Sequence, residues 1–247
     1  MAQSDAPMPA RLPVRGSDLL LILILTLGGA RVLLPLLAGA LLPGGTAGGA
    51  GFGGIMAILA IQLGFMAAVA YAVVVHLRGT SWQQLGFVPL TPGWAGRSFV
   101  ITLASLPVLV LVGWAQREFA GDGFRNPQLD VILPDSFSTA AFLATLVITA
   151  VVAPLVEETI FRGVLYRWLR ERLGVPLGMG VSAGAFALLH GIPALIPGIF
   201  VLGLILAWVY ERANSIWAPI IVHGTYNGLV TLTLYLALMQ GVKPAAG

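Results

Sequence analysis

The sequence predicts an all-α fold, a polytopic bundle of about seven to eight transmembrane helices. Of its 247 residues, 58% are hydrophobic and only 9% are charged, whereas a soluble domain carries about 25% charged residues. Several runs of about twenty residues contain almost no charge, which is the length needed to cross a hydrocarbon layer roughly 30 Å thick. Polar and apolar residues do not alternate along these runs, so the strands of a membrane barrel are not indicated.

Seven hydrophobic runs, separated by charged or Gly/Pro-rich breaks, give the expected helices in chain order. They lie at residues 19–42, 52–76, 96–116, 137–162, 176–190, 196–211 and 216–239. The fifth run is short, and a break in the third or the sixth run would add an eighth helix. We therefore expect a cytoplasmic tail at 1–18 and a single membrane-embedded helical domain at 19–240.

The first run also has features of a cleavable signal peptide. Leu19–Leu27 is apolar, and the sequence Gly28-Gly29-Ala30 could be cut. Apolar sequence resumes at once from Val32 to Leu42, which favours an uncleaved first helix. Arg31 then lies near the middle of the membrane, where we expect it to face the bundle or to extend toward the interface.

The distribution of lysine and arginine predicts a cytoplasmic N-terminus and an outer C-terminus, because short cytoplasmic loops carry an excess of these residues. With this orientation the outer segments hold only Arg117, Arg125 and Lys243, and the outer loop near 117–136 also carries four acidic residues. The inner segments hold Arg11, Arg15, Arg78, Arg97, Arg167, Arg170, Arg172 and Arg212. We expect a multi-pass protein of the cell membrane.

The composition also excludes several classes of function. Cysteine is absent, which rules out disulfides, a thiolate nucleophile and iron–sulfur or Cys-ligated zinc sites. The formal charge of +3 is dispersed, and no basic run could follow a phosphate backbone, so nucleic-acid binding is not indicated. Between the second and third runs, Trp82, Phe87 and Trp94 stand among Gly, Pro and Thr residues. We interpret that stretch as an interfacial segment anchored by aromatic rings, with a substrate-docking surface as the alternative.

Three ionisable residues, Glu157, Glu158 and Arg162, stand together at the end of the fourth run. Each charge near the centre of a membrane helix costs about 2.5–3.5 kcal/mol on insertion scales, so these groups need partners or a wet cavity. Glu158 and Arg162 are spaced i, i+4 with the acid first, which favours a helical ion pair. Glu157 lies about 100° round the helix without a local cation. An unpaired carboxylate can act as a base; the alternative is that the three charges only mark the membrane boundary.

Two histidines occur in otherwise apolar helices. His190 follows Phe186 at i, i+4, and a lone buried histidine is usually structural. In the last run, however, His223 and Asn227 are also spaced i, i+4, so that both side chains project from one helical face. Both histidines therefore lie in apolar helices, and His223 has an amide beside it.

Other catalytic motifs fail on their context. The sequence from Gly180 to Gly184 matches G-x-S-x-G, but a nucleophile elbow requires a strand–turn–helix. Its Ser182 also lies about 12 Å along a helix from His190. We interpret the two glycines as sites of close helix packing. No H-E-x-x-H zinc-protease sequence occurs, and no second intramembrane aspartate completes an aspartyl pair.

These residues together resemble the three motifs of the CAAX-protease and bacteriocin-processing (CPBP, or Abi) family of intramembrane endopeptidases, and are similar to those of type II CAAX prenyl endopeptidases. The resemblance covers about residues 80–230, with the catalytic core at about 137–230, and no motif residue is substituted. The motifs are Glu157-Glu158-x-x-x-Arg162, Phe186-x-x-x-His190 and His223-x-x-x-Asn227.

The resemblance implies a helical membrane enzyme with a water-filled cavity that opens toward the cytoplasm. It implies that Glu157 and His190 activate a water molecule, and that His223 and Asn227 stabilise the oxyanion. Glu158 and Arg162 would hold the helix that carries Glu157 in position. Peptide hydrolysis without Ser or Cys needs a base, oxyanion donors and a proton for the leaving amine, and these residue types supply all three. The expected substrate is a membrane-associated protein or peptide.

Three alternatives stay open at this stage. Glu157, His190 and His223 could instead form a zinc site with an open position for water, although the family resemblance favours a metal-independent enzyme. A non-catalytic immunity or scaffold protein is the second alternative. The third is a proton-coupled carrier that uses Glu157 and His190 as a relay, but no inverted repeat supports it.

Overall fold

The computed structural model describes residues 11–29, 32, 36, 39–40, 51–121, 124 and 126–242. Every regular element within these residues is a helix, and five helices are long and apolar enough to cross a membrane. The expected fold class, a polytopic helical bundle, is confirmed. The expectations for Ala30, Arg31, Arg125 and Lys243 fall outside the described residues.

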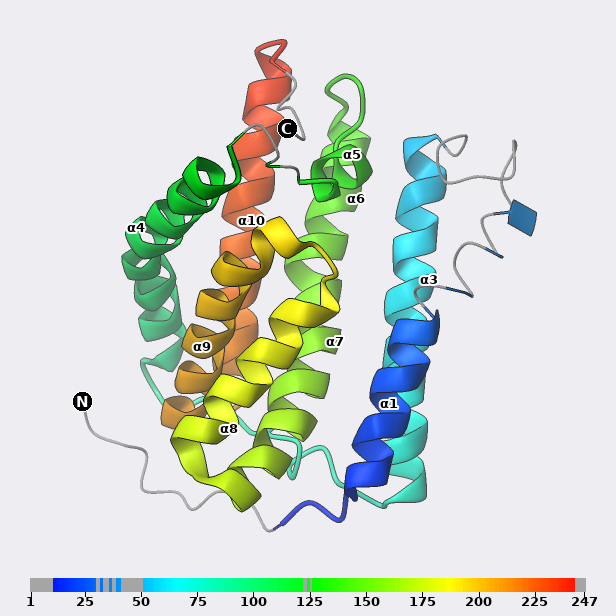
Figure 1. The fold of residues 1–247 in the computed structure, drawn as a ribbon, viewed down its shortest axis with the longest axis vertical. Helices are drawn as coiled ribbons and strands as arrows, with labels where there is room; N and C mark the ends of the chain where they lie inside the picture. Colours follow the sequence, from blue (N-terminus) through cyan, green and yellow to red (C-terminus); the bar gives the residue numbers. More distant parts are fainter. Residues whose placement is uncertain are drawn as a thin grey trace.

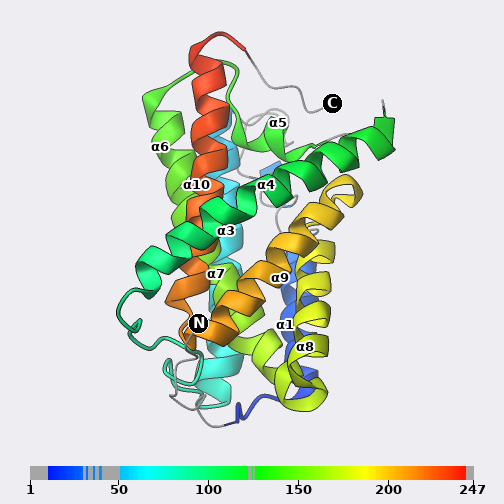
Figure 2. The ribbon, with the colours of Figure 1, turned by 90° about the vertical axis from the view of Figure 1, so that its left-hand side faces the viewer.

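The helices pack side by side, most of them close to the long axis of the molecule (Figure 1). The view at 90° shows α4 and α9 tilted across the bundle (Figure 2). The described elements are α1 (Gly16–Gly28), α3 (Phe52–Ala70), the π-helix η2 (Tyr71–Leu77), α4 (Trp94–Ala120), α5 (Gln128–Ile132), α6 (Thr139–Val147), the π-helix η4 (Ile148–Val152), α7 (Ala153–Glu158), the π-helix η5 (Thr159–Tyr166), α8 (Arg167–Leu189), the 3₁₀-helix η6 (Pro193–Leu195), α9 (Ile196–Ala213) and α10 (Trp217–Met239).

The span count is lower than the expected seven to eight for two reasons. The fourth and fifth predicted runs fall within one continuous helical stretch, Thr139–Leu189. The chain nevertheless turns at Gly174, where φ 76° and ψ 175° interrupt the helix, and α8 returns alongside α7 (Figure 1). Only glycine adopts this backbone conformation without strain. The first run is described only in part, and its apolar helix Gly16–Thr26 is shorter than a span.

The contact between α8 and α9 is close, but it does not use the glycines that the sequence suggested. Both Gly180 and Gly184 have open space beside them, so the expectation of packing through them is wrong. The contact lies instead at Gly203, where an added Cβ would stand 3.0 Å from Cβ of Ala183. Ser182 is buried, and its hydroxyl donates to the carbonyl of Phe161 at 3.3 Å, so this serine connects α8 to η5.

The segment before α1 is packed rather than extended into solvent. Leu12 and Val14 are 5% and 3% exposed, and the backbone N–H of Leu12 donates to Glu171 Oε1 at 3.3 Å. Arg78, at the end of η2, forms a two-pronged ion pair with Asp18 at 2.7 and 2.8 Å. The beginning of α1 is thereby fixed to the end of the next long helix.

The aromatic residues of the predicted interfacial segment separate into two groups. Trp82 is 48% exposed, and its ring contacts Tyr71 and Phe87 at centroid distances of 6.4 and 5.3 Å. Phe87 in turn contacts Trp217 at 5.5 Å. These four rings form a row at one end of the bundle. Trp94 is only 5% exposed and belongs to the hydrophobic core, so it does not share the anchoring role expected for all three residues.

Candidate active site

The two adjacent glutamates lie on a short α-helix between two π-helical segments. α7 follows η4 and precedes η5, within one unbroken helical stretch. A π turn holds one residue more than an α turn, and single π turns inside α-helices are frequent at functional sites. After the glutamates, η5 buries all of its residues from Ile160 to Tyr166. The helix that carries the glutamates is thus enclosed by neighbouring helices on its C-terminal side.

Glu158 and Arg162 form the ion pair that their spacing predicts. Arg162 Nη1 lies 2.8 Å from Glu158 Oε1, and both side chains are fully buried. Arg162 also donates to the carbonyl of Gly203 on α9 at 3.1 Å, and its guanidinium lies 4.5 Å from the ring centroid of Phe186 on α8. Because these contacts compensate the buried charge, the pair connects the helix of the glutamates to its two neighbours.

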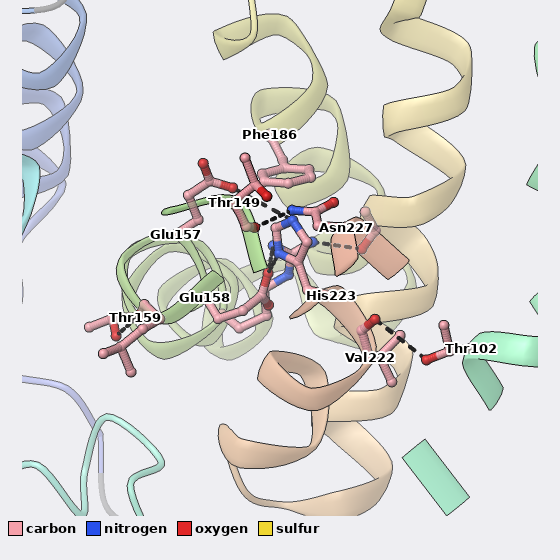
Figure 3. A network of polar contacts seen from close by, with 12 residues as sticks. Thr102, Thr149, Glu157, Glu158, Thr159, Phe186, Val222, His223 and Asn227 are labelled. Carbon is pink, nitrogen blue, oxygen red and sulfur yellow. Dashed lines mark hydrogen bonds and ion pairs between the residues drawn. The ribbon is translucent and has the colours of Figure 1, made fainter. Parts of the chain in front are cut away.

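The imidazole of His223 lies between the two carboxylates (Figure 3). Its Nδ1 is 2.9 Å from Glu158 Oε1, and its Nε2 is 3.8 Å from Glu157 Oε2. A carboxylate paired with a guanidinium can only accept hydrogen bonds, so Nδ1 carries a proton and donates it to Glu158. This contact orients the ring and directs Nε2 toward Glu157.

Glu157 and Glu158 have different surroundings although they are adjacent. The side chain of Glu157 is 19% exposed, whereas that of Glu158 is fully buried. Figure 3 shows the carboxylates of Glu157 and Glu158 directed to different sides of their helix. As the spacing predicts, Glu158 is the carboxylate paired with Arg162, and Glu157 is the less buried of the two.

Asn227 lies one turn after His223 on α10, as the spacing predicts, but its amide contacts a backbone group. Nδ2 of Asn227 donates to the carbonyl of Thr149 in η4 at 2.8 Å. Thr149 also contacts Thr231, one turn further along α10, at 3.0 Å between the two hydroxyl oxygens. An amide nitrogen carries two N–H groups, so this contact uses one and orients the other.

His190 approaches the site through Phe186 rather than through the carboxylates. Its Nδ1 lies 2.7 Å from the carbonyl oxygen of Phe186, so Nδ1 donates and Nε2 keeps its lone pair. The ring of Phe186 contacts His190 at 4.8 Å and His223 at 5.8 Å between centroids. Phe186 therefore separates and aligns the two imidazoles.

The zinc site that the sequence left open as an alternative requires Glu157, His190 and His223 to share one ion. No group of three or more His, Cys, Asp or Glu side chains in this part of the chain is arranged to hold a metal ion. Glu157 and His223 are close, but the polar contact of His190 is with its own helix. That contact uses Nδ1 of His190 and not its other ring nitrogen, Nε2.

An apolar cavity of about 330 Å³ lies beside the helix of the glutamates. Its walls come from α3, η2, the segment near residue 85, α7, η5 and the start of α10, and include the row of aromatic rings described above. Val156 and Thr159, which flank the two glutamates in sequence, belong to its wall. The hydroxyl of Thr159 is bound to the carbonyl of Leu155, so the cavity offers almost no polar group to an occupant.

Comparison with known proteins gives a family match over the segment that holds these residues. Residues 139–229 match the family described as "Type II CAAX prenyl endopeptidase Rce1-like". This match supports a relation to the CAAX-protease-like family. The resemblance recognised in the three motifs is thereby confirmed, because all of the motif residues lie inside this segment.

A curated relative points the same way. Over 139 residues the chain is 25% identical to a protein of Bacillus subtilis (strain 168) that bears the name "Putative membrane peptidase YdiL". The match covers 56% of this chain and 54% of the relative, so the chain spans about half the length of the curated relative it matches. No solved structure matches the chain significantly.

Three contributors to the site were not predicted from the sequence. Two are backbone carbonyls, those of Thr149 and Gly203, which accept from Asn227 and Arg162. The third is the ring of Phe186, which contacts Arg162 and both histidines. Every residue has a backbone carbonyl, so residue type could not identify these two. Phe186 belongs to the second motif, and that position was the signal that could have identified it.

Proposed function

We propose that this protein is an intramembrane endopeptidase that hydrolyses a peptide bond of a membrane-associated protein or peptide. The observation that carries the proposal is the accessible carboxylate of Glu157, 3.8 Å from an imidazole whose other nitrogen is bound to Glu158. The carboxylate proposed as the base is thus close to the oriented imidazole of His223, which in turn contacts the buried carboxylate of Glu158. Similarity to a family of prenyl endopeptidases supports the same reaction class.

In the proposed mechanism Glu157 removes a proton from a water molecule as the hydroxide attacks the scissile carbonyl carbon. His190 assists, because its Nε2 can accept a hydrogen bond from the same water. The proton taken by Glu157 is then delivered to the leaving amine, which balances the reaction. General base catalysis of this kind contributes about 10²–10⁴-fold.

The oxyanion of the intermediate requires donors, and α10 supplies them in this proposal. When both ring nitrogens of His223 are protonated, Nε2–H donates to the oxyanion, while Glu158 stabilises the positive ring through Nδ1. The second N–H of Asn227 is the other donor. Each preorganised donor of this type contributes about 2.7–4 kcal/mol to the transition state.

The apolar cavity beside α7 suits the lipid-like part of such a substrate. A wall with almost no polar atoms cannot compensate the desolvation of a polar group, so the occupant is expected to be an apolar side chain or hydrocarbon chain. We propose that this apolar group anchors the substrate at the membrane and leaves the peptide bond of the substrate near Glu157. The lipid bilayer is then part of substrate recognition.

The decisive experiment compares wild-type protein with Glu157→Gln in a cleavage screen on membrane proteins. Glutamine keeps the shape of the side chain and removes its basicity, so cleavage should fall by a factor of about 10² or more, with the melting temperature retained. Glu118→Gln, an exposed change at the end of α4, is the matched control and should cleave like wild type. Cleavage by Glu157→Gln at the wild-type rate would show that the assignment is wrong and would favour the non-catalytic alternative.

We further propose that the reaction is metal-independent. Elemental analysis of the purified protein should find no stoichiometric zinc, and a chelator should leave the cleavage rate unchanged. Stoichiometric zinc, with chelator inactivation that added zinc reverses, would contradict this proposal and restore the metalloenzyme alternative.

A further inference from the structure

A proline precedes the two glutamates by three residues, and its missing N–H alters the backbone hydrogen bonds of their helix. In an α-helix the carbonyl of residue i accepts from the N–H of residue i+4, and in a π-helix from that of residue i+5. Pro154 has no N–H. In an α-helix the carbonyl of Ala150 would accept from residue 154, and in a π-helix the carbonyl of Thr149 would do so. Pro154 can donate to neither carbonyl.

The carbonyl of Thr149 loses its other intrahelical donor as well. That donor would be the N–H of Ala153, which instead bonds to the carbonyl of Ile148 in the π register of η4. Neither register thus supplies an N–H to Thr149. In a membrane-spanning helix such a carbonyl must be satisfied from another element, because no bulk water is present.

α10 meets both affected carbonyls. Asn227 donates its Nδ2–H to the carbonyl of Thr149 at 2.8 Å. Gly224 lies so close to the carbonyl of Ala150 that an added Cβ would clash with that oxygen. His223, the neighbour of Gly224, is the residue that bonds to Glu158. The two carbonyls that Pro154 affects are therefore the two against which the helix of His223 is docked.

We propose that Pro154 is a positioning residue of the active site. By withholding an N–H it leaves the carbonyl of Thr149 available to Asn227, and this contact sets the register of α10 so that His223 meets Glu157 and Glu158. Pro154 touches no reacting group and acts through Asn227. The proposal rests on the endopeptidase function proposed above.

Pro154→Ala tests the proposal because alanine restores the N–H with a small change of shape. The restored N–H can bond the carbonyl of Thr149 within the helix and draw its oxygen toward the helix axis, away from Asn227. Turnover should then fall about 10-fold to 10²-fold with KM nearly unchanged, which is the scale expected for a misplacement of about 1 Å. The melting temperature in detergent should stay or rise, because alanine is favoured over proline inside a helix. Unchanged turnover would overturn the proposal, and so would a fall in turnover matched by a fall in melting temperature.

Two further variants separate the possible failures. Pro107→Ala removes an exposed proline inside α4 and should leave turnover unchanged. In the Asn227→Ala background, Pro154→Ala should cause no additional loss, since its effect passes through Asn227; an undiminished additional loss would overturn the proposal. If Glu157→Gln abolishes cleavage while Pro154→Ala does not lower it, only the positioning role is wrong. If Glu157→Gln cleaves like wild type, the proposed function fails and the positioning role fails with it.

Discussion

A single oxygen atom, Oε1 of Glu158, connects several parts of the site. It accepts from Arg162 on its own helical stretch and from His223 on α10, while Arg162 also donates to Gly203 on α9. Because this carboxylate is fully buried, loss of a charged neighbour would leave an uncompensated charge, at a cost of about 3–5 kcal/mol. Glu158 is therefore suited to positioning, which leaves the less buried Glu157 as the candidate base.

Asn227→Ala tests whether the amide contributes to the reaction or only to packing. Asparagine does not titrate, so its contribution is hydrogen-bond donation to charge that appears in the transition state. Loss of such a donor costs about 2.7–4 kcal/mol, or roughly 10²–10³ in turnover, and KM should be nearly unchanged. An interhelical hydrogen bond contributes only about 0.6 kcal/mol on average to stability, so the melting temperature should fall little.

The measurement pairs cleavage kinetics with thermal unfolding in detergent. Thr233→Ala is the control on the same helix, because the hydroxyl of Thr233 is exposed and donates to the backbone one turn earlier. Normal turnover with a clearly lowered melting temperature in Asn227→Ala would assign the asparagine to packing. The oxyanion would then lack its proposed second donor.

Spacing along one helix was enough to predict some contacts of the site but not others. The pair Glu158 and Arg162 lies within one helical turn, so its i, i+4 spacing predicted the observed ion pair. The contact between His223 and Glu158 joins residues 65 positions apart. It depends on how α10 packs against the helix of the glutamates, which no local pattern specifies, and only the resemblance to a family grouped these residues.

At the scale of helices, the position of α10 depends on two glycines of unequal importance. Gly224 allows the backbone of α10 to approach the carbonyl of Ala150, whereas Gly228, one turn later, has ordinary space, with an added Cβ at 3.6 Å from Cβ of Ala150. Close approach through small residues is a common means of packing membrane helices. The two glycines therefore form a matched pair for mutation.

Gly224→Ala should displace α10 from η4 and lower both stability and turnover. Overpacking of this kind typically costs about 1–3 kcal/mol, and His223 would move with the helix. Gly228→Ala should have nearly the melting temperature and cleavage rate of the wild type, because its new methyl group fits. Thermal unfolding and a cleavage assay on both variants provide the check. Equal behaviour of the two variants would show that the close approach at Gly224 is unimportant.

The accuracy of the predicted helices depended on how clearly the sequence marked their ends. The runs predicted at 52–76 and 216–239 correspond to helices at Phe52–Leu77 and Trp217–Met239, because glycine-rich or polar segments border them. The runs at 137–162 and 176–190 became one stretch, since the residues between them continue the helix up to the turn at Gly174. π segments were not predicted, because they differ from α-helix by one residue per turn rather than by hydrophobic pattern.

At the scale of the whole molecule, the ends of the helices divide according to charge. Figure 1 places the start of α1, the end of η2, the turn at Gly174 and the junction of α9 with α10 at the same end of the bundle. Seven of the eight arginines assigned to the inner face lie in or beside these places, namely Arg11, Arg15, Arg78, Arg167, Arg170, Arg172 and Arg212. The fold thus places at one end of the bundle the arginines that the sequence predicts to be cytoplasmic. This excess of arginine favours a cytoplasmic position for that end.

Labelling of single cysteines tests this orientation, and the absence of cysteine from the sequence makes every introduced thiol unique. Thr91→Cys places a thiol in the exposed segment between η2 and α4, and Ser136→Cys places one in the exposed segment before α6. The two segments lie at opposite ends of the bundle (Figure 1). If the arginine-rich end faces the cytoplasm, a membrane-impermeant thiol reagent added to intact cells should label Ser136→Cys, and Thr91→Cys only after the cells are opened. Labelling of Thr91→Cys alone in intact cells would reverse the orientation and place the row of aromatic rings on the outer side.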